Sequence, residues 1–172
     1  MADDDRVLPA ALAEVAGVEF DYDEGDGVDF EPFDAFLDAE ETTDWLRAWT
    51  GNPEVDGDAF RVFGQDGTGG YGAIWLARPG RPLAEQPVVF LGSEGETGVV
   101  ACDLASFLWL VADGSGPLEA VEYPTRGSRP NAELAGIAER RAPGGRRSAA
   151  EVAAEAAERY PDFEDMVFEL CR

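Results

Sequence analysis

The sequence predicts an α+β fold in which an antiparallel sheet of about 4–6 strands is packed with helices. Apolar runs between Phe60 and Ala101 are short and are separated by turns rich in Gly and polar residues. A continuous apolar segment with helical spacing follows at residues 104–112. The 172-residue chain is 45% hydrophobic and 10% aromatic, which is typical of a globular protein.

The N-terminal region is predicted to begin with a helix and a strand. Residues 8–15 are rich in Ala and Leu, and a Pro is acceptable in the first turn of a helix. Val18, Phe20 and Tyr22 alternate with charged residues, which predicts a short edge strand.

The next segment, from Pro32 to Trp49, has apolar and aromatic residues at helical spacing. Thr42 or Thr43 is expected to cap a helix in this segment, and Gly51 is expected to end it. The aromatic stripe of the segment is expected to cover one face of the sheet.

A meander of four strands is predicted next. The first strand begins at Phe60, a Gly-rich turn occupies residues 65–70, and the second strand begins at Tyr71. The third and fourth strands are expected at residues 87–92 and 98–101. Apolar residues alternate on both sides of these strands, so both faces of the sheet are expected to be covered.

Helices follow the meander. Asp103 is a good N-cap for the helix at residues 104–112, and Gly114 a good stop. Beyond residue 123 the composition changes, because residues 126–147 contain six Arg and two acidic residues, with Pro and Gly clusters. A helix is expected within them at residues 132–141.

The C-terminal residues are predicted to form a helical extension. Ser148 and Glu151 form a capping box that opens an Ala-rich helix. After a break at Pro161, a final turn is expected to bury four apolar side chains. These are Phe163, Val167, Phe168 and Leu170. The chain is thus divided into an α+β domain (1–123), an Arg/Pro/Gly-rich connecting segment (124–147) and a helical extension (148–172).

The meander resembles the SUKH superfamily of bacterial immunity proteins, which is related to a fungal cell-wall regulatory scaffold. The resemblance is carried by FGQDGTGGYGAIW (residues 63–75), PVVFLGSEGETGVVA (residues 87–101) and the helix at residues 103–110. It implies a SUKH-like fold for residues 1–123. It also implies an intracellular, non-catalytic protein that neutralises a toxin by occluding it.

The formal net charge of −23 restricts the class of partner. All 13 basic residues are Arg, whereas nucleic-acid binders carry basic patches that displace counterions from phosphates. Direct binding to nucleic acid or to an anionic membrane is therefore disfavoured, and a basic protein partner, such as a toxin domain, is favoured. The alternative that an acidic surface serves only solubility stays open.

The absence of His and Lys restricts the chemistry. It removes Ser-His and Cys-His pairs, His ligands for zinc, Schiff bases and the P-loop lysine. The two cysteines, Cys102 and Cys171, do not form a metal or redox motif and are expected to be reduced and buried. The sequence therefore predicts no enzyme activity, no catalytic residues, no metal and no cofactor.

An acidic loop resembles a calcium site only superficially. An EF-hand loop that began at Asp21 would need Gly and Glu where Asp26 and Pro32 stand, so a solvated loop is expected. No secretory signal precedes it, and the longest apolar run is too short to span a bilayer, so a cytoplasmic protein is predicted.

Partner contacts are expected at the two turns of the meander, from the turn residues Asp66 and Tyr71 and from Glu94 and Glu96 of the opposite turn. Two alternatives remain at this point. One is a regulatory scaffold that recruits partners without a toxin. The other is a carboxylate-based hydrolase, which would need two carboxylates in a deep cleft.

Overall fold

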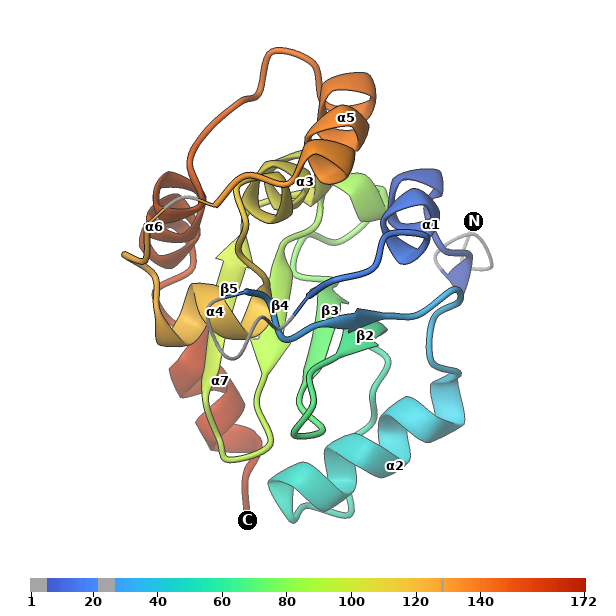
Figure 1. Ribbon diagram of the computed structural model, residues 1–172. Coiled ribbons are helices and arrows are strands. Elements are labelled where there is room, and N and C mark those ends of the chain that lie inside the picture. The colour runs from blue at the N-terminus through green and yellow to red at the C-terminus, as the bar shows by residue number, and fades with distance from the viewer. Residues whose placement is uncertain (1–5, 22–26, 128) are drawn as a thin grey trace.

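The computed structural model describes residues 6–21, 27–127 and 129–172. These residues form one antiparallel sheet whose strands follow in sequence order, from β1 at one edge to β5 at the other (Figure 1). The strands are β1 (Glu31–Pro32), β2 (Phe60–Gln65), β3 (Tyr71–Trp75), β4 (Val88–Leu91) and β5 (Thr97–Ala101). The helices are α1 (Ala10–Ala16), α2 (Ala39–Thr50), the 3-10 helix η3 (Leu83–Glu85), α3 (Leu104–Ala112), α4 (Pro117–Glu122), α5 (Ala132–Arg141), α6 (Ala149–Arg159) and α7 (Phe163–Leu170). The predicted α+β architecture is confirmed.

Each face of the sheet packs on its own hydrophobic core. Successive residues of β4 alternate, with Val88 and Phe90 in one core and Val89 and Leu91 in the other. The first core contains α3 together with residues of α1, α4, α5 and α6, and the second contains residues of α2 and α7. Figure 1 shows α1, α3 and α5 on one side of the sheet and α2 on the opposite side. Apolar residues on both faces of the meander thus produce three layers.

Short-range signals located most of the helix starts. The Asp103 carboxylate accepts a hydrogen bond from the Ser106 N–H at 2.8 Å, and Ser148 with Glu151 forms the predicted capping box of α6. At α2, however, the cap is Asp38, whose carboxylate accepts from the Glu41 N–H at 2.8 Å. The prediction of Thr42 or Thr43 at this position was wrong.

Helical structure also begins later in this segment than the sequence predicts. Residues 33–38 are not helical, and backbone N–H groups of Phe33 and Leu37 donate instead to β2 carbonyls. These hydrogen bonds continue the pairing along the edge of β2 past the end of the short strand β1. Gly51 ends α2 in the left-handed conformation, with φ of 67°, as expected for a Gly at this place.

The predicted edge strand at Val18, Phe20 and Tyr22 is not formed. Tyr22 lies outside the described residues, and Val18 and Phe20 belong to no strand. Their side chains pack into the first core, where the Phe20 ring contacts Phe30 edge-on with centroids 5.4 Å apart. The alternation of apolar and charged residues therefore arises because Val18 and Phe20 anchor a loop to the core, and not because they form a strand.

The Arg-rich segment contains α5 at the predicted position, and this helix packs on α3 and α1. Leu134, Ile137 and Ala138 are buried in the first core. The indole N–H of Trp109 on α3 donates to the Ala142 carbonyl oxygen at 2.9 Å, which fixes the residue that follows α5. Residues 124–147 therefore contribute to the first core, and residues 1–123 and 148–172 contribute to both cores.

The last helix buries only part of the predicted apolar set. Phe163 and Val167 lie in the second core, but Phe168 is 65% exposed and Leu170 is half-buried. Successive residues of a helix point about 100° apart, and in α7 the direction of Val167 faces the second core while that of Phe168 faces solvent. Burial of Phe168 was thus a wrong prediction. Among the described residues, no helix combines the length and apolarity needed to cross a membrane.

Candidate functional site

The two turns that the sequence singles out lie beside each other at one end of the sheet. The β2–β3 turn contains Thr68, and the β4–β5 turn contains Ser93. The Ser93 hydroxyl donates to the Thr68 hydroxyl oxygen at 2.8 Å. The β2–β3 turn (residues 66–70) and the β4–β5 turn (residues 92–96) therefore form one region of the molecule, which we call the turn end.

Asp66 supports its turn from inside. Its side chain is only 5% exposed, and its Oδ1 accepts hydrogen bonds from the Thr68 N–H, the Thr68 hydroxyl and the Gly70 N–H at 2.7–2.9 Å. A carboxylate used in this way offers almost no surface to a partner. We therefore assign Asp66 to shaping the turn rather than to partner contact.

Tyr71 begins β3 and is half-buried against α2. Its ring lies 4.5 Å from that of Trp45 and 6.4 Å from that of Phe33, measured between centroids. Burial, together with the nearby charge of Glu41, raises the pKa of the Tyr71 hydroxyl above its usual value. Tyr71 is thus a neutral aromatic at the margin of the turn end.

The two glutamates of the β4–β5 turn carry the negative charge of this end. Glu94 is exposed, Glu96 is half-buried, and Gly95 between them adopts a φ of 96° that suits Gly. The Gly92 N–H donates to the Glu96 carbonyl at 2.6 Å and closes the turn. Of the four residues predicted to contact a partner, only Glu94 is exposed, whereas Glu96 and Tyr71 are half-buried and Asp66 is buried.

A groove of about 340 Å³ lies next to this turn, between α2, the turn and α7. Its lining includes Trp49, Glu94, Val167, Phe168 and Cys171. The Trp49 indole N–H donates to the Gly92 carbonyl at 2.7 Å, so the ring is fixed against the turn. The sequence identified Glu94 but missed Trp49 and Phe168, because helical spacing alone assigned both to the core.

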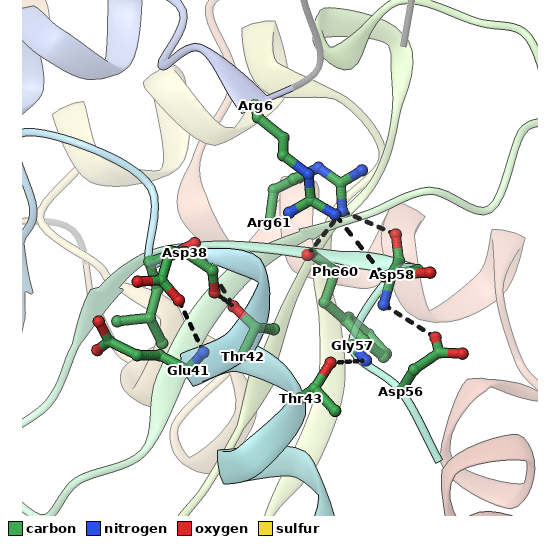
Figure 2. A network of polar contacts seen from close by, with 11 residues as sticks. Arg6, Asp38, Glu41, Thr42, Thr43, Asp56, Gly57, Asp58, Phe60 and Arg61 are labelled. Carbon is green, nitrogen blue, oxygen red and sulfur yellow. Dashed lines mark hydrogen bonds and ion pairs between the residues drawn. The ribbon is translucent and has the colours of Figure 1, made fainter. Parts of the chain in front are cut away.

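A second hollow, of about 550 Å³, lies at the other end of α2 and is lined by acidic residues. Its carboxylates are Glu31, Asp34, Asp38 and Glu41. Figure 2 shows two of these residues, Asp38 and Glu41: the Glu41 N–H points to the Asp38 carboxylate, and the Thr42 hydroxyl points to the Asp38 carbonyl. This hollow adds to the acidity of the α2 side of the molecule.

Two of these carboxylates influence each other. The Glu41 backbone N–H lowers the pKa of Asp38, whereas a hydrogen bond with the Asp38 carboxyl raises the pKa of Glu41. Both effects follow from the start of α2, where Asp38 is the N-cap. The Asp38 carboxylate therefore caps α2.

Part of the acidic N-terminal region is neutralised by the Arg-rich segment. Glu14 on α1 pairs with Arg140 at 2.8 Å and with Arg141 at 2.5 Å. Arg126 donates to the carbonyl oxygens of Gly27 and Gly114 at 2.8 and 3.0 Å. The two ion pairs join α1 to α5 and do not involve Glu94 or Glu96 of the turn end.

Within the described residues, no group of three or more His, Cys, Asp or Glu side chains is arranged to hold a metal ion. Asp23 and Asp26 of the acidic loop lie outside these residues. Cys102 is buried as predicted, whereas Cys171 is exposed, which the sequence did not predict. Burial raises the pKa of the Cys102 thiol.

Comparison of the chain with models of known protein families, with curated proteins and with solved structures finds no match. The chemistry of the surface is therefore the basis for assigning a function.

Proposed function

We propose that this protein is a non-catalytic binding module that neutralises a basic protein partner, a toxin domain, by occluding its active site. The observation that carries the proposal is the turn end, where the exposed residues Glu94 and Phe168 line one groove and Glu96 lies in the same turn as Glu94. A polar or charged rim around aromatic anchors is the usual anatomy of a protein–protein interface.

The charge of the whole chain supports a basic partner. At −23, the field of the protein attracts positively charged surfaces and repels nucleic acid. A toxin that acts on phosphate-containing substrates needs a basic cleft. An acidic protein surface can fill such a cleft by imitating the charge of the substrate, and the resemblance of the meander to SUKH proteins makes immunity the biological setting.

Two other functions compete with this one. A regulatory scaffold would use the same acidic surface without a toxin, and it differs only in its partner. A hydrolase would use carboxylates of the hollow beside α2, and we do not favour it because Asp38 is engaged in helix capping there.

The test is to purify the tagged protein from its native cells and to identify what co-purifies by mass spectrometry. We expect a partner with a basic toxin domain. Expressed alone in another bacterium, that partner should arrest growth, and co-expression of the protein should restore it.

A matched variant controls for non-specific charge effects. Glu94→Arg combined with Glu96→Arg should lose the partner and the protection, whereas Glu133→Arg on the exposed face of α5 should keep both. Co-purification of a harmless partner would favour the scaffold, and a partner that is not basic would contradict the proposal.

A further inference from the structure

The groove at the turn end has rigid aromatic walls. Trp49 stacks on Trp45 with ring centroids 5.6 Å apart and an interplanar angle of 16°. Its indole N–H is bound to the Gly92 carbonyl, and Val167 in the groove wall is only 3% exposed. Because these side chains are already fixed, an occupant would not have to order them, which favours binding.

Phe168 also lines the groove and is 65% exposed. Among the described residues, three large hydrophobic side chains are exposed, namely Val7, Tyr123 and Phe168. Only Phe168 of these lines the groove. An exposed aromatic ring beside a preformed hollow marks an interaction site more strongly than a single exposed ring on a flat surface.

The charge of the lining selects the occupant. Glu94 is the only charged side chain among the groove residues, and it is exposed. The volume of about 340 Å³ is at the lower end of the range for ligand pockets, so it suits one or two large side chains. An apolar side chain can fill the space between Trp49 and Phe168 while a neighbouring cation pairs with Glu94.

We infer that this groove binds a segment of the basic partner in which a large apolar residue is followed or preceded by Arg or Lys. The inference rests on the proposed function, since both assign a basic protein partner. A second copy of this chain is the less suitable occupant, because two molecules of charge −23 repel each other.

The test uses random 16-residue peptides displayed on phage and selected on the wild-type protein. Selected peptides should combine an aromatic or aliphatic residue with at least two Arg or Lys. For the synthesised peptides, we expect Phe168→Ala to weaken binding about tenfold or more. Glu94→Gln should weaken it by about two- to fivefold at low salt.

The double variant Glu122→Gln, Tyr123→Ala is the matched control, because it removes an exposed carboxylate and an exposed aromatic ring outside the groove. It should bind the peptides as the wild type does. Circular dichroism of every variant should be unchanged, since all these side chains are exposed.

Three outcomes would overturn the inference: enrichment of no peptide, enrichment of peptides without positive charge, or binding that Phe168→Ala leaves intact. Concentration-dependent dimerisation that Phe168→Ala abolishes would instead assign the groove to a second copy. Failure of the two proposals can be told apart. If a basic toxin co-purifies equally with wild type and Phe168→Ala, the groove is wrong and the function stands. If the expected peptides are selected but no toxin co-purifies, the groove is right and the proposed function is wrong.

Discussion

The indole N–H of Trp109 and the carbonyl oxygen of Ala142 form a buried hydrogen bond of 2.9 Å that joins α3 to the residue after α5. The guanidinium of Arg146 lies over the same indole, 5.6 Å from the ring centroid. The Trp109 side chain of α3 therefore contacts both the residue that follows α5 and the loop that contains Arg146. The Arg-rich segment is fixed to the core by specific contacts as well as by its few apolar residues.

Replacing Trp109 by Phe should test this attachment. The variant keeps an aromatic ring but removes the indole donor, so that the Ala142 carbonyl keeps only the longer hydrogen bond from the Gly145 N–H at 3.3 Å. We therefore expect a loss of about 0.5–1.5 kcal/mol in the free energy of unfolding, the usual net contribution of one hydrogen bond. Amide hydrogen exchange should show weaker protection in α5 than in β3 and β4. Equal loss of protection throughout would mean that α5 unfolds only with the whole protein.

Signals within a few residues predicted most of the fold. Alternating apolar residues with Gly turns predicted the meander, and Asp103 and Ser148 located two helix starts by their side-chain chemistry. Contacts between distant segments were not predictable in this way. Asp38 and Thr42 can both cap a helix, although Asp is the better cap. The aromatic spacing from Pro32 suggested an earlier helix, whereas residues 33 and 37 bond to β2 and α2 begins only after Asp38.

The candidate site was half predictable. Charge and turn position singled out Glu94, which lines the groove, and Glu96, which does not. Charge alone could not show that Asp66 points into its own turn. Phe168 was assigned to the core because α7 is apolar on more than one side, and only the packing of α7 on the sheet decides which side is buried. The groove it lines depends on three segments far apart in the chain and has no local signature.

Phe107 is expected to dominate the stability of the first core. It is fully buried on α3, and its ring meets that of Phe63 on β2 edge-on at 5.3 Å. Truncation to Ala should lower the free energy of unfolding by about 3–5 kcal/mol, measured by urea denaturation. A loss below about 1 kcal/mol would contradict the packing of α3 on the sheet.

Glu119 should make stability depend on pH. The residue is 3% exposed, and burial raises the pKa of its carboxyl above the ordinary value of 4.5 although it accepts a hydrogen bond from the Asp29 N–H at 2.9 Å. Above pH 4.5 the unfolded chain releases this proton more readily than the folded protein, so the contribution of Glu119 to stability falls as pH rises.

Glu119→Gln keeps an acceptor for Asp29 and removes the titration. Relative to wild type, it should be more stable at about pH 7 than at about pH 4, as measured by denaturant unfolding at both values. Glu122→Gln, a substitution at an exposed position of the same helix, is the control for pH effects that do not depend on burial. A difference between Glu119→Gln and wild type that does not change with pH would show that the buried carboxyl keeps its ordinary pKa.

The two cysteines should react very differently with a thiol reagent. Cys171 is exposed, whereas Cys102 is 3% exposed and burial raises the pKa of its thiol, which lowers the fraction of reactive thiolate. One thiol per chain should therefore be modified in the native protein and two in denaturant. Cys171→Ser should abolish the native reaction, and rapid modification of that variant would place Cys102 nearer the surface.

Association with the basic partner should be controlled by electrostatic attraction. Raising the salt concentration from about 50 to 500 mM shortens the range of the field, so the association rate should fall steeply while the dissociation rate changes less. Stopped-flow or surface-based kinetics with the co-purified partner measure both rates. An association rate that does not respond to salt would rule out attraction by the acidic surface.

Charge reversal then locates the surface that the partner approaches. Glu94→Arg and Glu96→Arg should slow association more than Glu133→Arg, although each substitution changes the net charge equally, because only the first two glutamates lie at the turn end. Charge reversal of Glu41, which lines the second hollow at the other end of α2, tests whether the partner contacts that hollow instead of the turn end. If Glu41→Arg has the larger effect, the partner contacts the N-terminal end of α2, and the turn end contributes only to the general field.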